Sequence, residues 1–398
     1  MTPRPTRLLF LMSRFLDGGI DTVLVEYLAR LAQRPEYRLT LAVGISMGAL
    51  EVYRDRLPRE VSLCYLVDEP WLTWGARRRV EKRMPAVLKA ADEALITPLR
   101  RLLQRRRLHR LADVADVVVD FDSCFYSPLR GVRTPRVAFF HFSFALIMEQ
   151  DPRRMTRMAR QLAHYDRVVL LSQAMREEGT HMFPALAKKF VVIYNAKDPA
   201  RLRALAAEQP ADVAAAAPFV LAVERLAEPK DIPTLLEAFA LLRRRHGHRD
   251  LQLRIIGKGP YEEALRQQAQ QMGLHDGVVF MGFVANPYPW MAACRLLAFS
   301  SKAEGLPTVL IEGLLLDVPI VSTDCPTGPH EILADGQAGL LTPVGDAQAM
   351  AQAMHRLLTD DALRQQLAQG RRRQATLFTF DTVDRQLDEL FAIAQATS

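Results

Sequence analysis

Two glutamates in the stretch AEGLPTVLIEG, residues 303–313, have the type and spacing to hold a ligand with hydroxyl groups on both sides of a phosphate. Glu304 precedes a Gly-Leu-Pro turn, and Glu312 lies within an expected apolar helix over 307–316. The free N–H groups at the start of a helix favour an anion. A carboxylate can accept two hydrogen bonds from a vicinal diol. The spacing therefore predicts a phosphate site with a sugar on either side, the shape of a nucleotide sugar.

Glu312 is surrounded by apolar residues, which predicts that its carboxylate is buried. An unpaired buried carboxylate is costly, so it needs a partner, and a ribose is the partner we expect. The alternative is a side chain that reaches the surface, with Glu304 as an acid favoured by the helix dipole. Pro307 is expected at the first helical position, where its missing N–H costs nothing.

Two cations follow a predicted strand in the segment ERLAEPKD, residues 224–231. Arg225 and Lys230 are placed to neutralise a diphosphate leaving group, although loop cations are usually only solvated. Further along, Gly257 and Gly259 in IIGKGP allow a tight turn after a strand. A single G-x-G is weak support for a phosphate site.

In the first half of the chain, Gly18 and Gly19 separate the first predicted strand from the first helix, where a backbone can approach a ligand closely. Asp17 and Asp21 flank this diglycine and could cap the helix or bind acceptor hydroxyls. His141 ends the apolar run RVAFFHF and is expected to point at a cleft, with a core histidine as the alternative.

Short apolar runs alternate with amphipathic stretches along the whole chain, which predicts parallel sheets covered by helices on both faces. The expected strands are 8–12, 38–43, 61–67, 116–121, 136–142, 167–172, 190–195, 219–224, 251–257, 278–283, 295–301, 319–323 and 339–342. The expected helices are 22–33, 233–245, 261–273, 307–316, 346–358 and 381–396.

The pattern restarts after an Ala- and Pro-rich segment, 205–218, which indicates two doubly wound Rossmann-like α/β domains in series. We predict an N-terminal domain over 1–200, a nucleotide-sugar-binding domain over 201–375 and a final helical segment over 376–398. Ligands of such sheets bind at the carboxyl ends of the strands, so the cleft between the domains is the expected site.

Composition places the chain among ordinary globular proteins, with 49% hydrophobic and 24% charged residues. The four cysteines form no C-x-x-C pair, so neither a zinc site nor a disulfide framework is indicated. The apolar run near the N-terminus is too short for a secretory signal, and no run of about 18 apolar residues occurs. We therefore expect a cytoplasmic protein.

The segment 77–110 carries twelve Lys or Arg against three acidic residues. A solvated helix pair is one interpretation. The other is a basic surface for anionic lipid head groups, which we rank above nucleic acid because no aromatic residue interleaves the run. We therefore expect a peripheral position at the inner face of the cell membrane and no nucleic-acid partner.

Together these segments resemble the glycosyltransferase family 4 enzymes of the GT-B fold, of the kind that builds bacterial cell-surface glycans. The resemblance rests on GGIDT, FFHFSF, VIYNAKD, AVERLAEPKDIPTLLEAF, IIGKGP, VVFMGF and, above all, SSKAEGLPTVLIEGLLLDVPIVSTDCPTGPHEIL. The last contains the family's E-x(7)-E signature.

The resemblance implies a retaining transfer of a hexose from a nucleotide diphosphate sugar to a hydroxyl of a lipid-linked glycan, such as a lipopolysaccharide or capsule precursor, with no metal or other cofactor. The resemblance implies that the first domain is on the acceptor side and that the C-terminal helical segment, 376–398, returns to the first domain. It implies that Glu304 contacts the hexose, Glu312 the ribose, and Arg225 with Lys230 the diphosphate. The other implied positions are the phosphate-site backbone at Gly305, Leu306, Pro307 and Thr308, the base loop at Phe283 and Val284, and His141 and Gly19 near the transferred sugar.

Three segments depart from the family's usual pattern. Glu224 stands where glycine is common, Asp21 where glutamate is common, and VIYNAKD replaces Asn-Pro-x-Asp. Two alternatives stay open: a sugar epimerase or phosphorylase of the same fold, and a non-catalytic adaptor at a membrane or on nucleic acid.

Overall fold

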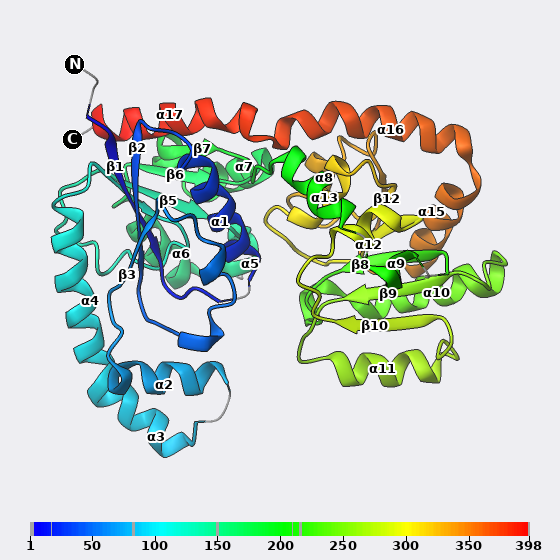
Figure 1. Ribbon diagram of the computed structural model, residues 1–398, viewed down its shortest axis with the longest axis horizontal. Helices are drawn as coiled ribbons and strands as arrows, with labels where there is room; N and C mark the ends of the chain where they lie inside the picture. The colour runs from blue at the N-terminus through cyan, green and yellow to red at the C-terminus, as the bar shows by residue number, and fades with distance from the viewer. Residues whose placement is uncertain are drawn as a thin grey trace.

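The computed structural model describes residues 4–16, 18–81, 84–148, 151–208, 210–214 and 217–396. Its architecture is two parallel β-sheets placed side by side, each covered by helices (Figure 1). All pairings within the sheets join parallel strands. The predicted fold class, two doubly wound α/β domains, is confirmed.

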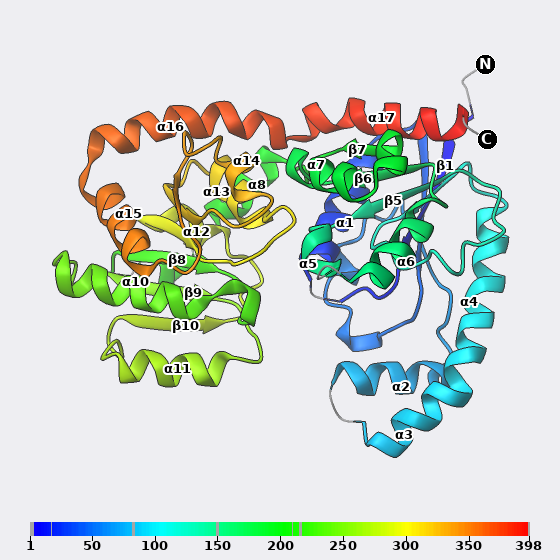
Figure 2. The same cartoon turned by 180° about the vertical axis from the view of Figure 1, so that it is seen from behind.

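The first sheet has seven strands in the order β3-β2-β1-β4-β5-β6-β7. The strands are β1 (Thr6–Met12), β2 (Tyr37–Val43), β3 (Ser62–Tyr65), β4 (Val117–Asp120), β5 (Arg136–Phe140), β6 (Arg167–Leu170) and β7 (Phe190–Val192). Helix α1 (Gly19–Leu31) covers the face seen in Figure 1, and Figure 2 shows α5 (Phe144–Met148), α6 (Pro152–Leu162) and α7 (Gln173–Met182) on the other. Burial from both sides explains why these strands are apolar almost throughout.

The second sheet has six strands in the order β10-β9-β8-β11-β12-β13. The strands are β8 (Phe219–Val223), β9 (Gln252–Ile256), β10 (Val278–Gly282), β11 (Leu296–Phe299), β12 (Ile320–Thr323) and β13 (Leu340–Thr342). The helices of this half are α10 (Ile232–Arg245), α11 (Glu262–Gln271), α12 (Tyr288–Ala293), α13 (Thr308–Leu315), α14 (Pro329–Ile332), α15 (Ala347–Thr359) and α16 (Asp361–Ala375).

Three further helices belong to the first half: α2 (Pro70–Val80) and α3 (Ala86–Ala91) lie below its sheet in Figure 1, and α4 (Thr97–Ala112) runs from them up along its side. The short helices α8 (Pro199–Ala207) and α9 (Ala211–Ala214) follow β7, and α8 packs against α12 of the second half. The chain therefore crosses from the first sheet to the second between β7 and α8.

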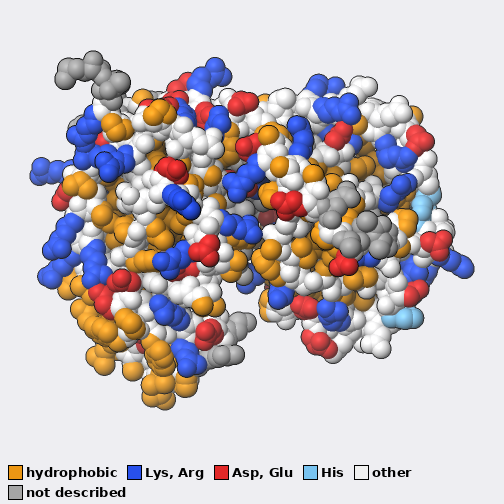
Figure 3. All heavy atoms as spheres, viewed as in Figure 1, with side chains coloured by type: hydrophobic (Ala, Val, Ile, Leu, Met, Phe, Trp, Pro, Cys, Tyr) orange, Lys and Arg blue, Asp and Glu red, His pale blue; other side chains and the backbone are white. Residues whose placement is uncertain are grey.

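The chain crosses back between α16 and α17 (Phe380–Ala396), which lies along the first half (Figure 1). Arg30 of α1 binds Asp384 at 2.6 Å, and Arg34 binds Asp388 at 2.8 Å. Buried Phe380, Val383, Leu387, Leu390 and Phe391 attach the helix to the core of the first half. On the side away from α17, the space-filling view is hollowed between the two halves (Figure 3).

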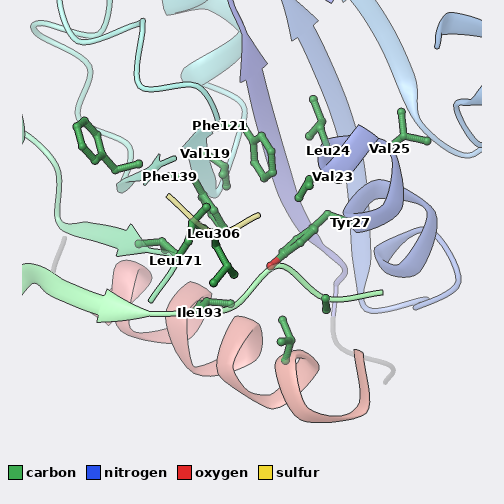
Figure 4. Packing of buried hydrophobic residues seen from close by; sticks show 14 of the residues in the cluster. Val23, Leu24, Val25, Tyr27, Val119, Phe121, Phe139, Leu171, Ile193 and Leu306 are labelled. Carbon is green, nitrogen blue, oxygen red and sulfur yellow. The ribbon is translucent and has the colours of Figure 1, made fainter. Parts of the chain in front are cut away.

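Leu306 from the second half joins the apolar core of the first. It is 6% exposed, and Figure 4 shows it among Phe139, Leu171 and Ile193. One hydrophobic cluster consequently runs through both halves, while a second, separate cluster lies within the second half.

Candidate active site

The strand order of each sheet reverses at one point, between β1 and β4 in the first sheet and between β8 and β11 in the second. Ligands of open α/β sheets bind at such points, beyond the carboxyl ends of the strands. Arg225 and Lys230 follow β8, and Glu304 follows β11. Sequence positions about 75 residues apart thus meet at the switch point of the second sheet.

Lys230 and Glu304 form an ion pair with Nζ and Oε1 2.5 Å apart. The Ser301 hydroxyl donates a hydrogen bond to the same oxygen, and the ammonium lies 5.3 Å from the centre of the Phe299 ring. Burial alone would lower the pKa of Lys230, but the charge of Glu304 outweighs it and raises that pKa. The lysine is therefore held as a cation beside a carboxylate, and a phosphate and a sugar hydroxyl could each replace one partner of the pair.

Arg225 is exposed, and its side chain makes no hydrogen bond or ion pair with the residues that the structure describes. It is therefore a second cation at this edge that is available to an anionic ligand. Its neighbour Glu224 is 5% exposed, and neither carboxylate oxygen has a hydrogen-bond partner among the described residues. Burial raises the pKa of Glu224 to about 8, so the side chain is mostly neutral at pH 7.

Gly257 and Gly259 bring the loop after β9 against the loop after β8. A Cβ at Gly257, where φ is +144°, would lie 1.9 Å from the Glu224 carbonyl oxygen, and one at Gly259 would lie 2.0 Å from that of Leu226. Only glycine fits at either position.

The predicted base loop follows β10. Phe283 is 46% exposed and Val284 is half-buried. The Gly257 amide donates to the Gly282 carbonyl at 2.8 Å, which joins this loop to the turn after β9. The predicted glycine turn and base loop are therefore adjacent, and their role toward a nucleotide stays a prediction.

The predicted phosphate-site backbone, 305–308, lies where the two halves touch. A Cβ at Gly305 would be 2.1 Å from the His141 carbonyl oxygen, and the Thr327 hydroxyl donates to the Glu304 carbonyl. Helix α13 begins at Thr308, with Pro307 as its N-cap, so the expectation that Pro307 occupies the first helical position is wrong by one residue. Its fixed φ suits the extended N-cap conformation equally well.

His141 is buried at 9% exposure, beside the stacked Phe121 and Phe139 rings. Its Nε2 lies 2.6 Å from the Phe121 carbonyl oxygen, and burial lowers the pKa of the imidazole to about 4. The ring is therefore neutral and engaged in the core of the first half, beside the contact with Gly305. Its predicted role toward a sugar stays a prediction.

The diglycine loop of the first half is held by Asp21. Its carboxylate accepts hydrogen bonds from the backbone N–H groups of Leu16 at 2.8 Å and Gly18 at 2.9 Å. Of the two roles left open for Asp21, the structure shows capping, and Asp17 lies outside the described residues. A Cβ at Gly19 would meet no atom within 4 Å, so the start of α1 faces open space.

Glu312 is buried at 7% exposure, as expected, but it has a partner within the protein. Lys197 places its Nζ 2.7 Å from Glu312 Oε1 and 3.0 Å from Glu26 Oε1, and the Tyr288 hydroxyl donates to Glu312 at 3.2 Å. The argument that this carboxylate needs a ribose because it lacks a partner is therefore wrong. Its predicted contact with a ribose now requires that the ribose share the carboxylate with Lys197.

Lys197 is the residue that the sequence argument missed. It is 1% exposed, and although burial opposes its charge, Glu26 and Glu312 raise its pKa well above the usual value. The available signal was a lysine five residues after the end of β7, at the point where the chain leaves the first domain. Among the described residues, no group of three His, Cys, Asp or Glu side chains is arranged to hold a metal ion.

The second half of the chain matches the family model described as Glycosyl transferases group 1 over residues 217–360. Residues 217–360 form a glycosyl transferases group 1 domain. The matched range contains Arg225, Lys230, Glu304 and Glu312.

Curated relatives match half of this chain or less. The N-acetylgalactosamine-N,N'-diacetylbacillosaminyl-diphospho-undecaprenol 4-alpha-N-acetylgalactosaminyltransferase of Campylobacter jejuni is 34% identical over 199 residues, 50% of this chain and 52% of the relative. The lipopolysaccharide core biosynthesis glycosyltransferase LpsE of Rhizobium meliloti is 33% identical over 158 residues, 40% and 44% of the two chains. The chain thus spans about half the length of these relatives or less.

Solved structures match nearly the whole chain. HepE of Anabaena in complex with UDP has a TM-score of 0.75 at 20% identity, covering 97% of this chain and 100% of that one. TarM has a TM-score of 0.76 at 11% identity, covering 97% and 98%. This likeness confirms the GT-B arrangement of the fold.

Proposed function

We propose that this protein is a retaining glycosyltransferase that moves a hexose from a nucleotide diphosphate sugar to a hydroxyl of a lipid-linked glycan. The observation that carries the proposal is the pair of Lys230 and Glu304 at the switch point of the second sheet, beside the free cation of Arg225. Two cations would stabilise charge developing on a diphosphate as it leaves, and a fixed carboxylate would orient the hexose.

The donor class is supported by the structures of similar fold. HepE has been crystallised with UDP and with UDP-glucose. We propose that Arg225 and Lys230 bind the diphosphate of a UDP-sugar, that Glu304 accepts hydrogen bonds from the hexose, and that Glu312 accepts them from the ribose. The protein needs no metal or other cofactor for this in our proposal, because both positive charges come from its side chains.

The acceptor class is supported by the names of the relatives, which describe a diphospho-undecaprenol acceptor and lipopolysaccharide core biosynthesis. We propose an acceptor of the same chemical class, a glycan linked to a lipid diphosphate, used at the cytoplasmic face of the cell membrane.

The first experiment measures binding without turnover. Purified protein is heated with UDP, GDP, UDP-glucose, UDP-galactose, UDP-N-acetylglucosamine and GDP-mannose in turn. A nucleotide that binds only the folded state raises the melting temperature. Lys230→Ala is expected to abolish the shift that the best nucleotide produces. Glu262→Gln on α11, which removes only a surface pair with Arg266, is the control and is expected to retain that shift.

The second experiment follows transfer to an undecaprenyl diphosphate-linked sugar. Lys230→Ala and Glu304→Gln are expected to lower the rate by about 100-fold or more while both variants stay folded, since preorganised charge is lost from the transition state. Proton NMR of the product is expected to show the anomeric configuration of the donor. Unchanged turnover in either variant contradicts the site, and a second nucleotide sugar formed without acceptor indicates an epimerase instead.

A further inference from the structure

The helices α2, α3 and α4 carry large apolar side chains that point into solvent. The exposed fractions are 58% for Trp71, 45% for Trp74, 80% for Val87, 45% for Leu88, 72% for Leu95, 38% for Leu99 and 45% for Leu102. Figure 3 shows apolar side chains gathered over these helices, at the lower left. We call these seven residues the apolar tip. Contiguous exposed apolar surface of this kind usually marks a site of interaction.

The residues of the apolar tip share helix faces because they are spaced three or four positions apart. Helix α3, a π-helical segment (Asp92–Ile96) and α4 follow one another without a break. Leu95, Leu99 and Leu102 are spaced four and three residues apart, which places them on one face. On α2, Trp71 and Trp74 are three apart and share the face opposite buried Leu72 and Ala76.

A buried ion cluster fixes the projecting helices against one another. Asp92 is 6% exposed and binds Arg100 at 2.8 Å and Arg79 at 2.5 Å. Arg100 also donates to the Leu72 carbonyl at 2.9 Å, and a Cβ at Gly75 would lie 2.3 Å from the Asp92 carboxylate. The interior of this projection is therefore already occupied, by this ion cluster and by buried Leu72 and Ala76, and the apolar tip lies outside it.

Exposed cations accompany the apolar tip. They are Arg78, Lys89, Arg101, Arg105 and Arg106, and the nearby exposed acids are Glu81 and Glu93. Residues 82–83 of the predicted basic segment lie outside the described residues. Tryptophan, leucine and arginine together are the composition of a surface that lies in the interface of an anionic bilayer. The described part of the chain has no helix long and apolar enough to cross a bilayer.

We propose that α2, α3 and the first half of α4 insert the apolar tip into the head-group region of an anionic lipid bilayer. The tip enters the boundary between head groups and acyl chains, and the surrounding arginines and lysine bind lipid phosphates. This goes beyond the charge-based expectation for 77–110, because it requires insertion and includes Trp71 and Trp74, which lie outside that segment. It does not depend on the proposed transfer reaction, since vesicle binding needs no donor.

The orientation that follows is compatible with a lipid-linked acceptor. The tip and the hollow between the halves lie on the same side of the molecule, away from α17 (Figures 1 and 3). Insertion of the tip therefore turns the cleft toward the bilayer.

The test uses the full chain and vesicles of phosphatidylcholine with about 30 mol% phosphatidylglycerol. Only three tryptophans are present, and Trp290 is 5% exposed, so changes in fluorescence on binding report Trp71 and Trp74. We expect co-sedimentation, a blue shift of the emission, and quenching by lipids with a spin label on the acyl chain. Binding should weaken but persist at about 0.5 M NaCl, because insertion is not screened by salt.

Leu95→Gln with Leu99→Gln is expected to weaken vesicle binding by about tenfold or more. The control Val344→Gln changes an equally exposed apolar residue of the second half (40% exposed) and should leave binding unchanged. The melting temperature and the shift produced by UDP should be the same in both variants and the wild type.

Three outcomes overturn the proposal: wild-type protein that stays in the supernatant, binding without acyl-chain quenching that salt abolishes, and a dimer in light scattering that Leu95→Gln with Leu99→Gln dissociates. The second would show adsorption by charge alone, and the third would show that a second copy covers the tip. Loss of the UDP shift with vesicle binding intact would contradict only the proposed transferase function.

Discussion

Glu224 lies in an environment that disfavours the charged form of its carboxyl group. The carboxyl group is buried beside Lys230 and Glu304, and its oxygens have no hydrogen-bond partner among the described residues. Burial raises its pKa to about 8, from an ordinary value of 4.5. Between these two values the unfolded chain has released the proton that the folded chain keeps. The group therefore makes the folded protein less stable as pH rises from about 4.5 to 8.

Glu224→Gln is expected to remove this pH-dependent loss, because an amide has nearly the same shape and no proton to release. The free energy of unfolding of the variant, relative to wild type, should rise by up to about 1.4 kcal/mol per pH unit between pH 5 and 8. Denaturant titrations at several pH values measure this difference. The surface variant Glu262→Gln serves as control and should show no such trend, and a flat difference for Glu224→Gln would mean that Glu224 is ionised in the folded protein.

The pattern of apolar runs and amphipathic stretches in the sequence predicted most of the fold. Each of the thirteen expected strands is present, because a strand buried on both faces must be apolar throughout. Several boundaries differ: the run 190–195 forms a strand only to Val192, and α13 begins one residue after Pro307. Such ends depend on caps and neighbouring loops, which a periodic pattern does not contain. The helices α6, α7 and α16 were not among those expected.

The candidate site was predictable where its residues follow strands. Arg225, Lys230 and Glu304 each follow a predicted strand, where ligands of such sheets bind, and the family resemblance assigned all three to one nucleotide sugar. The place of Lys197 in the site was not predictable, because its partner Glu26 is 171 residues away in the chain. The exposure of Trp71 and Trp74 was not predictable either, because the same spacing fits a helix that is packed against a neighbour.

Lys197 joins three elements: α1 through Glu26, α13 through Glu312, and the segment after β7 on which it lies. Lys197→Met leaves two carboxylates buried without a cation. It is expected to lower the free energy of unfolding by about 3–5 kcal/mol at pH 7.5. This loss in free energy of unfolding should become smaller toward pH 5, because the carboxyl groups left without Lys197 then bind protons. Burial already raises the pKa of Glu26.

Lys302→Met is the matched control, because Lys302 is half exposed and pairs with Asp231 at 3.3 Å. Lys302→Met is expected to lower the free energy of unfolding by less than about 1 kcal/mol. Urea titrations of both variants at pH 7.5 and pH 5 provide the measurement. Equal costs for the two lysines, or a Lys197→Met deficit that does not change with pH, would show that the Glu26–Lys197–Glu312 cluster does not hold the two halves together.

The two halves share one apolar cluster, which makes the molecule a coupled unit and not two independent domains on a linker. Leu306 contributes to this coupling from the loop that also carries Glu304, so the arrangement of the candidate site depends on how the halves pack. The side chain is 6% exposed and lies among Phe139, Leu171 and Ile193 (Figure 4).

Leu306→Ala is expected to lower the free energy of unfolding by about 2–5 kcal/mol, because it removes buried methyl groups and leaves a cavity between the halves. Calorimetry should then resolve two transitions where the wild type shows one, since each half retains its own sheet and helices. Leu377→Ala is the control: Leu377 lies on the crossing segment but is 39% exposed, so its loss should leave a single transition. One transition in Leu306→Ala, shifted as a whole, would mean that α17 and the Lys197 cluster couple the halves without Leu306.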